Sequence, residues 1–170
     1  MRAAPARSRR PHAAASAGGG VRVQLRRRVR SWSPPRRDLA RWASAALGRR
    51  GAGRELGVCM VGAAESARLN ARFRGRRAPT NVLSFSPAPL PRGTALPAAP
   101  LGELVICPRL LRQEARAQDK TLQAHWAHLV VHGALHLAGY DHERAADARR
   151  MQRREIAVLR RLGFGNPYRS

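Results

Sequence analysis

Several features are scarce in this 170-residue sequence, and each scarcity excludes a class of protein. No run of apolar residues approaches the roughly 18 that a membrane-spanning helix needs, so the sequence predicts no transmembrane segment. The two cysteines, Cys59 and Cys107, both lie in short apolar runs. We therefore expect buried, reduced thiols rather than a disulfide or cysteine metal ligands.

Acidic residues are also few: 10, against 33 basic residues, which gives a formal net charge of +23. Lys120 is the single lysine, so the basic residues are almost all arginines. Arginine clusters bind phosphates with release of counterions, and the sequence therefore predicts a polyanion as partner. A membrane surface is the weaker alternative.

The two ends of the chain differ in composition from its middle. Residues 1–20 carry no acid, several arginines and three consecutive glycines, and we expect a disordered basic arm that adds nonspecific RNA affinity. An organellar targeting segment and a start codon placed too far upstream are the alternatives. Residues 21–165 are expected to form one folded domain, and residues 166–170 a loose tail.

Hydrophobic periodicity in the middle of the chain predicts alternating strands and helices. Strands are expected at 21–25, 55–61, 82–85 and 104–107, and the last of these is continuously apolar, so it should lie inside a sheet. Helices are expected at about 34–47, 63–73, 108–118, 122–138 and 144–162. Residues 87–100 contain five prolines and are expected to form a loop.

Two of these helices carry specific packing expectations. Leu69 and Phe73 are four residues apart in the second helix, so we expect them to pack together. The last helix has an apolar stripe that we interpret as packing without a functional role, formed by Ala148, Met151, Ile156, Leu159 and Leu162.

Five of the six histidines lie between positions 125 and 142, and their spacing predicts a metal site. His132 and His136 are four residues apart, so both rings project from one face of a helix and can reach one ion. Gly139 is expected to end that helix, which brings His142 back as a third ligand. Three protein ligands leave a fourth position for water, as in catalytic rather than structural zinc sites.

The neighbours of these histidines refine the prediction. His128 lies one turn before His132 and is expected to support a ligand or line the cleft, whereas His125 is expected at the surface. In metzincin proteases a glutamate that serves as general base follows the first histidine. Here that position is Gly133, which cannot take a proton, so the sequence argues against a zinc peptidase.

Three stretches resemble the YbeY family of bacterial metal-dependent endoribonucleases that mature ribosomal RNA. They are residues 69–85, which end in Pro-Thr-Asn-Val-Leu-Ser-Phe, residues 101–107, and residues 124–142, which contain His-Gly-Ala-Leu-His-Leu-Ala-Gly-Tyr-Asp-His. The resemblance implies a single α+β domain with a central four-stranded mixed sheet, surrounded by about five helices. It places the metal site on a helix and the turn after it.

The resemblance also implies which residues act. It implies one zinc ion held by His132, His136 and His142, and it matches Arg74 to the family's functional arginine. Arg74 lies in a basic turn that is either a solvated loop or a phosphate clamp; the candidate RNA-binding residues around it are Arg72, Arg76 and Arg77.

The implied activity is that of a cytoplasmic, single-strand-specific endoribonuclease acting in 16S rRNA 3′ end maturation and ribosome quality control. Its implied partners are rRNA, the small ribosomal subunit and assembly factors. The sequence shows no evident general base, and Asp141 is assigned no catalytic role. A zinc-stabilised assembly factor that binds rRNA without cutting it is therefore the alternative. The chain departs from the family at Gly102-Glu103, where Gly-Asp is usual.

Overall fold

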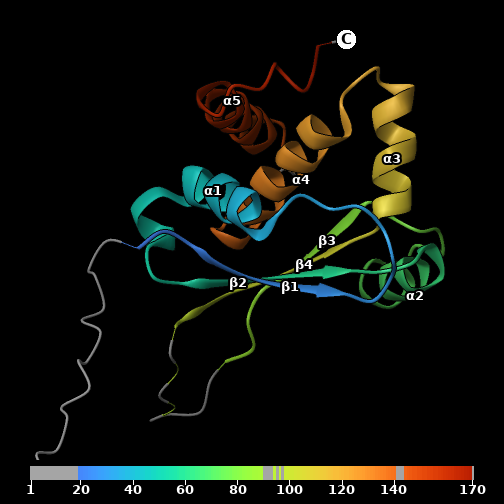
Figure 1. Ribbon diagram of the computed structural model, residues 1–170, viewed down its shortest axis with the longest axis horizontal. Helices are drawn as coiled ribbons and strands as arrows, with labels where there is room; N and C mark the ends of the chain where they lie inside the picture. Colours follow the sequence, from blue (N-terminus) through green and yellow to red (C-terminus); the bar gives the residue numbers. More distant parts are fainter. Residues whose placement is uncertain (1–18, 90–93, 95, 97, 141–143, 170) are drawn as a thin grey trace, which may run out of the picture.

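A mixed β-sheet with helices on both faces forms the fold (Figure 1). The computed structural model describes residues 19–89, 94, 96, 98–140 and 144–169, and within them the sheet has four strands in the order β1-β2-β4-β3. The α+β architecture and the four-stranded mixed sheet are thus confirmed. The predicted basic arm lies almost wholly outside the described residues.

The strands agree closely with the expected positions. They are β1 (Arg22–Arg27), β2 (Glu55–Met60), β3 (Val82–Phe85) and β4 (Pro100–Ile106). β1, β2 and β4 run parallel, and β3 pairs antiparallel with β4 at the edge. β4 begins at Pro100, earlier than expected, because the residues from Pro100 onward already pair with β2. A proline is tolerated there, since the first position of a strand needs no N–H donor.

The helices also begin and end close to the expected residues. They are α1 (Arg36–Leu47), α2 (Ala63–Arg74), α3 (Pro108–Ala117), α4 (Leu122–Leu137) and α5 (Ala145–Arg161). A short 3-10 helix, η1 (Gly48–Gly51), follows α1 and was not predicted. α4 begins at a capped end, since the Thr121 hydroxyl accepts a hydrogen bond from the N–H of Ala124 at 3.1 Å.

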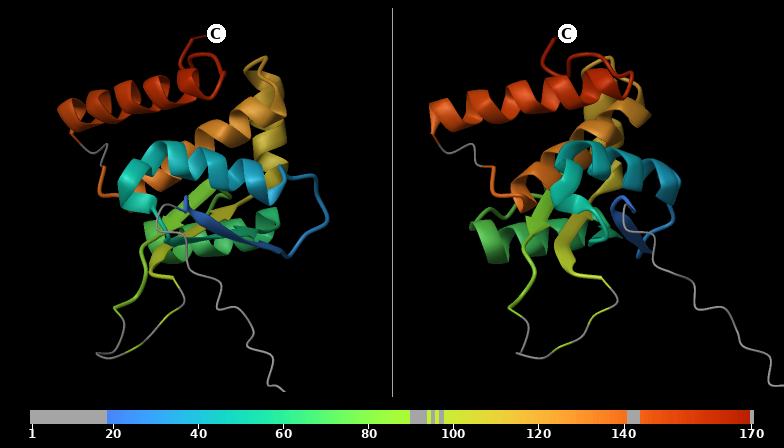
Figure 2. Two further views of the ribbon diagram at one scale, coloured as in Figure 1. Left: turned by 60° about the vertical axis from the view of Figure 1, so that its left-hand side comes forward. Right: turned by 90° about the vertical axis from the view of Figure 1, so that its left-hand side faces the viewer.

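The helices form two layers on one face of the sheet and a single layer on the other. α1 and α4 lie on one face of the sheet, α5 lies over them, and α2 lies on the opposite face (Figures 1 and 2). The larger core cluster lies between the sheet and α1, α4 and α5, and the fully buried Trp42 and Trp126 belong to it. None of the helices in the described part of the chain is long and apolar enough to cross a membrane.

A smaller core cluster lies beneath α2. It is built from Cys59, Val61, Leu83 and Val105, with Leu69 and Phe85 packed against it. Cys59 and Cys107 are both buried and free, and burial raises the pKa of the Cys59 thiol. The expectation of buried, reduced thiols therefore agrees with the structure.

The edge strand β3 contributes side chains to both faces of the sheet. Its pleat turns Val82 and Ser84 toward α4, and Leu83 and Phe85 toward α2. Phe73, which we expected to pack with Leu69, lines the same groove as Leu69 but is 55% exposed. It lies in the last turn of α2, where its ring meets the Phe85 ring edge-on, at 4.9 Å between centroids.

Candidate active site

A cleft of about 280 Å³ opens between α4 and the edge strand β3. It joins three stretches that are far apart in sequence: the segment from the end of α2 to β3, helix α4, and the C-terminal segment. The residues that line it are Arg74, Asn81, Val82, Ser84, His128, Leu129, His132, His136 and Tyr168.

α4 presents three histidines to this cleft because of its helical repeat. His128, His132 and His136 are spaced by one turn and lie on one face. The next residue after His132 faces the sheet instead: a Cβ at Gly133 would lie 2.6 Å from Cδ2 of Leu104. Gly133 thus allows α4 to lie close to β4, and a larger side chain here would not fit without a shift of Leu104.

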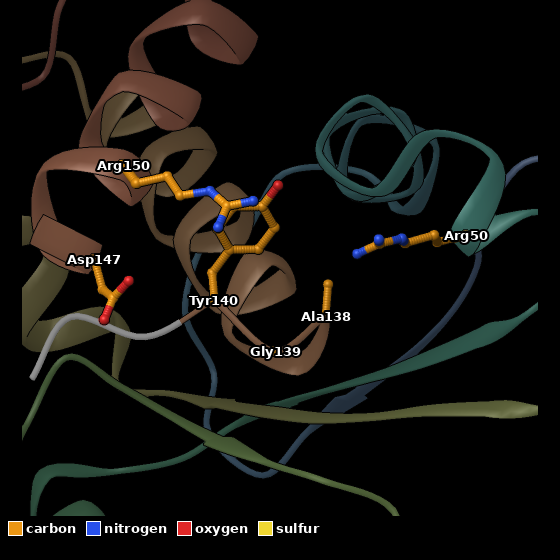
Figure 3. Close-up of a pocket in the computed structure, with 6 residues that line it drawn as sticks. All are labelled: Arg50, Ala138, Gly139, Tyr140, Asp147 and Arg150. Atoms are coloured by element: carbon orange, nitrogen blue, oxygen red, sulfur yellow. The ribbon is translucent and has the colours of Figure 1, made fainter.

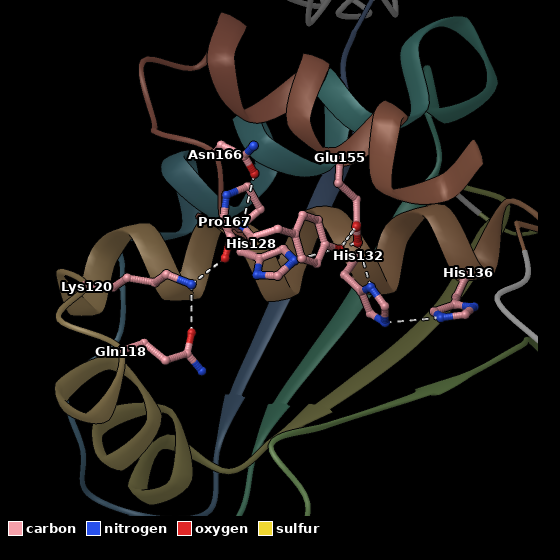
Figure 4. Close-up of polar contacts among 9 residues, drawn as sticks. Gln118, Lys120, His128, His132, His136, Glu155, Asn166 and Pro167 are labelled. Atoms are coloured by element: carbon pink, nitrogen blue, oxygen red, sulfur yellow. Dashed lines mark hydrogen bonds and ion pairs between the residues drawn. The ribbon is translucent and has the colours of Figure 1, made fainter. Parts of the chain in front are cut away.

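Two of the histidines are positioned to share a metal ion. The Nε2 atoms of His132 and His136 lie 3.1 Å apart (Figure 4). Two ligands on a tetrahedral zinc ion with bonds of about 2.0 to 2.1 Å are separated by about 3.3 Å, so the observed spacing fits one ion. The expected third ligand, His142, lies outside the described residues, as does Asp141.

A buried carboxylate that sequence reasoning missed lies beside His132. Glu155 of α5 is 0% exposed, and its Oε1 accepts a hydrogen bond from Nδ1 of His132 at 2.6 Å (Figure 4). Its Oε2 accepts a hydrogen bond from the Tyr168 hydroxyl. Burial alone would raise the pKa of Glu155, but these hydrogen bonds outweigh it and lower the pKa, so the carboxylate is charged at neutral pH.

The interpretation of α5 as packing alone is therefore corrected. Met151 and Leu159 are buried as predicted, whereas Ile156 is only partly buried. Glu155 lies on the buried face, four residues from each of those two apolar residues. An acidic residue on an apolar stripe was the signal that could have identified it, because such a group is buried only when it is paired.

His128 lies deeper in the cleft than the other two histidines. Its Nε2 is 3.8 Å from Oε1 of Glu155 and has no hydrogen-bond partner among the described residues. Burial lowers the pKa of His128 to about 4, with His132 adding to the effect and Glu155 opposing it. The ring is therefore neutral at pH 7 and able to donate a lone pair.

Two candidate ligand sets share His132. The first is the predicted set, in which the Nε2 atoms of His132 and His136 are close together and His142 lies outside the described residues. The second consists of His128, His132 and Glu155, whose ligand atoms all lie within 4.8 Å of one another. In the second set, however, Glu155 already receives hydrogen bonds from His132 and Tyr168. A buried carboxylate that accepts from the second nitrogen of a metal-binding histidine is a common support for the ligand, which favours the first set.

Beyond His136 the chain turns at Gly139, whose φ of +87° requires left-handed backbone. The guanidinium of Arg150 lies over the Tyr140 ring, 5.7 Å from its centroid, in a pocket that also includes Arg50 and Asp147 (Figure 3). This pocket shares no lining residue with the cleft. The glycine turn agrees with the predicted end of the helix.

A hydrogen-bonded chain at the other end of the cleft involves His125. We expected this histidine at the surface, but it is 4% exposed, and its Nε2 lies 2.7 Å from Oε2 of Glu114. Glu114 also accepts a hydrogen bond from Nδ2 of Asn81 at 3.0 Å, and these two hydrogen bonds hold the pKa of Glu114 below its ordinary value against the effect of burial. His125 and Glu114 thereby fix the amide of Asn81 at the cleft.

The basic turn divides between the cleft and the solvent. Arg74 is the last residue of α2, before the left-handed Gly75, and it lines the cleft with the histidines. Arg72, Arg76 and Arg77 are exposed and do not line the cleft, so their role in RNA binding remains a prediction.

The structure also places the C-terminal segment and Glu103. The segment at 166–169, expected to be a loose tail, contacts the domain: Tyr168 bonds to Glu155, and Nζ of Lys120 donates to the carbonyl of Pro167 (Figure 4). Glu103, which replaces the family's usual aspartate, pairs with Arg26 and lines the groove beneath α2 rather than the cleft.

Comparison with known proteins agrees with this fold. The family described as Endoribonuclease YbeY matches residues 34–163. An Endoribonuclease YbeY of Methylococcus capsulatus is 48% identical over 149 residues, covering 88% of this chain and 96% of the relative. One from Alkalilimnicola ehrlichii is 49% identical over 142 residues, covering 82% and 85%.

A solved structure shows the same fold at lower identity. The solution structure of a Thermotoga maritima protein is 24% identical, with a TM-score of 0.50, and the match covers 88% of this chain and 99% of that one. On the extent and identity of the sequence matches, the chain belongs to the YbeY endoribonuclease family.

Proposed function

We propose that this protein is a zinc-dependent endoribonuclease that cuts single-stranded RNA in the cleft between α4 and β3. The observation that carries the proposal is that this one cleft brings Arg74 to the same hollow as His128, His132 and His136. A guanidinium opposite a metal-binding histidine cluster is suited to a phosphodiester, since it can neutralise charge on the phosphoryl oxygens. The endoribonuclease names of the relatives support the same activity.

We propose His132, His136 and His142 as the zinc ligands. The donor set fits, because the two described Nε2 atoms are separated by about the distance that one ion requires. A zinc ion held there supplies Lewis acidity and lowers the pKa of a coordinated water toward about 7. No acidic side chain at position 133 is then needed as a strong general base.

The protein's own groups have separable tasks in this proposal. Glu155 holds the Nδ1 proton of His132 and so directs its Nε2 toward His136. Arg74 binds the phosphate to be cut and stabilises the charge that develops on it. Asn81, fixed by Glu114, offers a polar contact to the RNA backbone at the end of the cleft.

The biological role is the finer part of the proposal. We propose 16S rRNA 3′ end maturation and ribosome quality control in the cytoplasm, with the small ribosomal subunit and assembly factors as partners. Membership of the family and the net charge of +23, which favours a polyanion, support this role.

The test is cleavage of a single-stranded RNA by protein whose zinc content has been measured. We expect His136→Ala to abolish both stoichiometric zinc and cleavage, because it removes a ligand. Arg74→Gln should retain zinc but lower kcat by about 100-fold or more, in line with loss of one charge-stabilising donor. Arg68→Gln is the matched control, since Arg68 is an exposed arginine of the same helix that does not line the cleft.

The outcomes separate the proposal from its alternatives. Full cleavage by zinc-free His136→Ala would end the metal-dependent mechanism. Stoichiometric zinc in that variant would instead point to the set of His128, His132 and Glu155. If the wild type binds zinc and rRNA but cuts nothing, the protein is a zinc-stabilised assembly factor rather than an enzyme.

A further inference from the structure

A second hollow lies on the opposite face of β3, beneath α2. It is a groove of about 380 Å³ whose walls include Leu69, Phe73, Phe85 and Val105. Most apolar side chains in this groove are buried or half-buried, but Phe73 is 55% exposed. Trp32 is exposed to a similar degree, but Phe73 differs from it because its ring lines a groove together with other apolar side chains, and such a contiguous apolar surface is typical of a binding site.

The groove and the cleft meet at consecutive residues. Phe73 lines the groove, and the next residue, Arg74, lines the cleft. β3 separates the two hollows: Ser84 faces the cleft and Phe85 faces the groove. An RNA strand whose phosphate lies against Arg74 therefore needs to cross only the edge of β3 to bring a neighbouring base to Phe73.

The charge around Phe73 favours a nucleic acid over other occupants. The guanidinium of Arg72 lies over its ring, 5.3 Å from the centroid, and Arg76 and Arg77 follow exposed in the next turn. Aromatic rings with adjacent arginines are how proteins hold unpaired bases, since the ring stacks on the base and the arginines contact the phosphates.

The far rim of the groove is electrostatically balanced. Arg26 is paired with Glu103, and Arg28 with Glu65. Among the described residues, Arg72, Arg76 and Arg77 have no acidic partner, so the unpaired positive charge around the groove lies on the side of Phe73, where an RNA strand would enter. The apolar wall of the groove is sufficient to contact a base, and the arginines of the basic turn are sufficient to contact its phosphate.

We propose that this groove binds one unpaired nucleobase of the RNA substrate, stacked on Phe73 next to the phosphate that Arg74 holds. The inference rests on the proposed endoribonuclease function and adds a source of strand selectivity. A base in a duplex is stacked and paired, so it cannot reach Phe73, whereas a base in a single strand can.

The test compares kcat/KM for short RNAs that carry a single abasic ribose at each successive position. We expect Phe73→Ala to lower kcat/KM on intact RNA about tenfold, the lower part of the range for one stacked base. An abasic ribose at one position next to the cut should lower the wild-type value by a similar factor. The two changes together should cost no more than either alone, and the loss should fall in KM rather than kcat.

Two further variants guard the interpretation. Phe73→Trp keeps a stacking surface and should cut intact RNA as well as the wild type. Trp32→Ala removes another aromatic residue, 50% exposed and outside both hollows, and should cut RNA normally. Thermal unfolding of each variant checks that it is folded.

Four results would overturn the inference. Unchanged kcat/KM in Phe73→Ala would remove Phe73 from the substrate site while leaving the endoribonuclease intact. Losses that multiply at every abasic position would show that Phe73 contacts no particular base. If Phe73→Ala cuts short RNA normally but no longer associates with ribosomal particles, the groove is a protein-docking surface. If the wild type itself cuts no RNA, the proposed function fails, and this inference fails with it.

Discussion

Glu155 shows how one buried carboxylate can set the chemistry of a neighbouring histidine. Its Oε1 is 2.6 Å from Nδ1 of His132, and because an ionised carboxylate only accepts hydrogen bonds, Nδ1 must carry the proton. In the neutral ring, the lone pair of His132 is then at Nε2, on the side of His136. A metal ion would find the correct tautomer already present.

Replacement of this carboxylate should weaken zinc binding without unfolding the protein. Glu155→Gln keeps the shape of the side chain but removes the charge, so we expect zinc affinity to fall about 10- to 100-fold. Competition with a chromophoric chelator would measure it. Asp147→Asn is the matched control, because Asp147 lies in the first turn of the same helix and lines a different pocket.

The size of the loss is itself informative. A fall far beyond 100-fold would identify Glu155 as a direct ligand, in the set with His128 and His132. An unchanged affinity would contradict both roles.

At the scale of single residues, the sequence predicted which side chains of one helix share a face. It did not predict the contacts between side chains of different helices. The spacing of His132 and His136, and the resemblance around Arg74, were sufficient to predict that these residues belong to one site. Glu155 is 23 residues from its partner His132, and periodicity shows that a position is buried but not which residue it meets. His125 was misplaced for the same reason, since its partner Glu114 lies on another helix.

Among the elements, α4 determines the geometry of the site. Its fully buried side chains pack on the sheet and on α1, and this packing fixes the rotation at which its histidines face the cleft. Gly133 is the point of closest approach, where a Cβ would meet both Cδ atoms of Leu104, at 2.6 and 3.1 Å.

A methyl group at this position should be unfavourable despite the helical preference of alanine. Gly133→Ala gains about 1 kcal/mol in helix propensity, but overpacking a filled core costs about 1–3 kcal/mol. We expect a net loss of about 1 kcal/mol in the free energy of unfolding, measured by urea denaturation. Gly165→Ala is the control and should be neutral, because a Cβ there has no described atom within 4 Å. A stabilised Gly133→Ala would show that α4 can move away from β4.

Element boundaries were predictable because local residues set them. Pro108 opens α3, Thr121 caps α4, and Gly75 and Gly139 provide the left-handed turns that follow two helices. The orientation of Phe73 was not predictable in the same way. The i, i+4 spacing gives a shared face, but not whether the sheet extends far enough to cover it.

In the molecule as a whole, acidic groups are few and many of them hold the structure together. Glu155 and Glu114 bind histidines, while Glu65 and Glu103 pair with arginines of β1 and the loop after it. With a net charge of +23, protonation of such groups removes contacts and increases repulsion at the same time. Acid should therefore be more damaging than base.

The metal-free protein should lose stability as the pH falls from about 6.5 to about 4. The pKa of His128 is about 4 in the folded chain against 6.5 as its reference, so the unfolded chain binds more protons in this window and stability rises with pH. The contribution is about 3 kcal/mol. The lowered pKa values of Glu155 and Glu114 act with the same sign as the pH falls through their reference value of 4.5 and below.

Urea unfolding at a series of pH values, with chelator present, would measure this dependence. His128→Asn should unfold with a flatter pH dependence between pH 4 and 6.5 than the wild type, because it lacks the group that must be charged. Parallel curves for the two proteins would show that His128 titrates normally in the folded chain.

In the proposed zinc site, the hydrogen bond between His132 and Glu155 joins metal occupancy to the position of α5, the outermost helix. If docking of α5 raises the zinc affinity by a given factor, bound zinc raises the equilibrium constant for docking of α5 by the same factor, because coupling between two equilibria is reciprocal. Loss of the ion would then favour local opening at α5 ahead of global unfolding. Zinc supply would thereby influence how long each copy of the protein escapes proteolysis, as well as whether it can cut RNA.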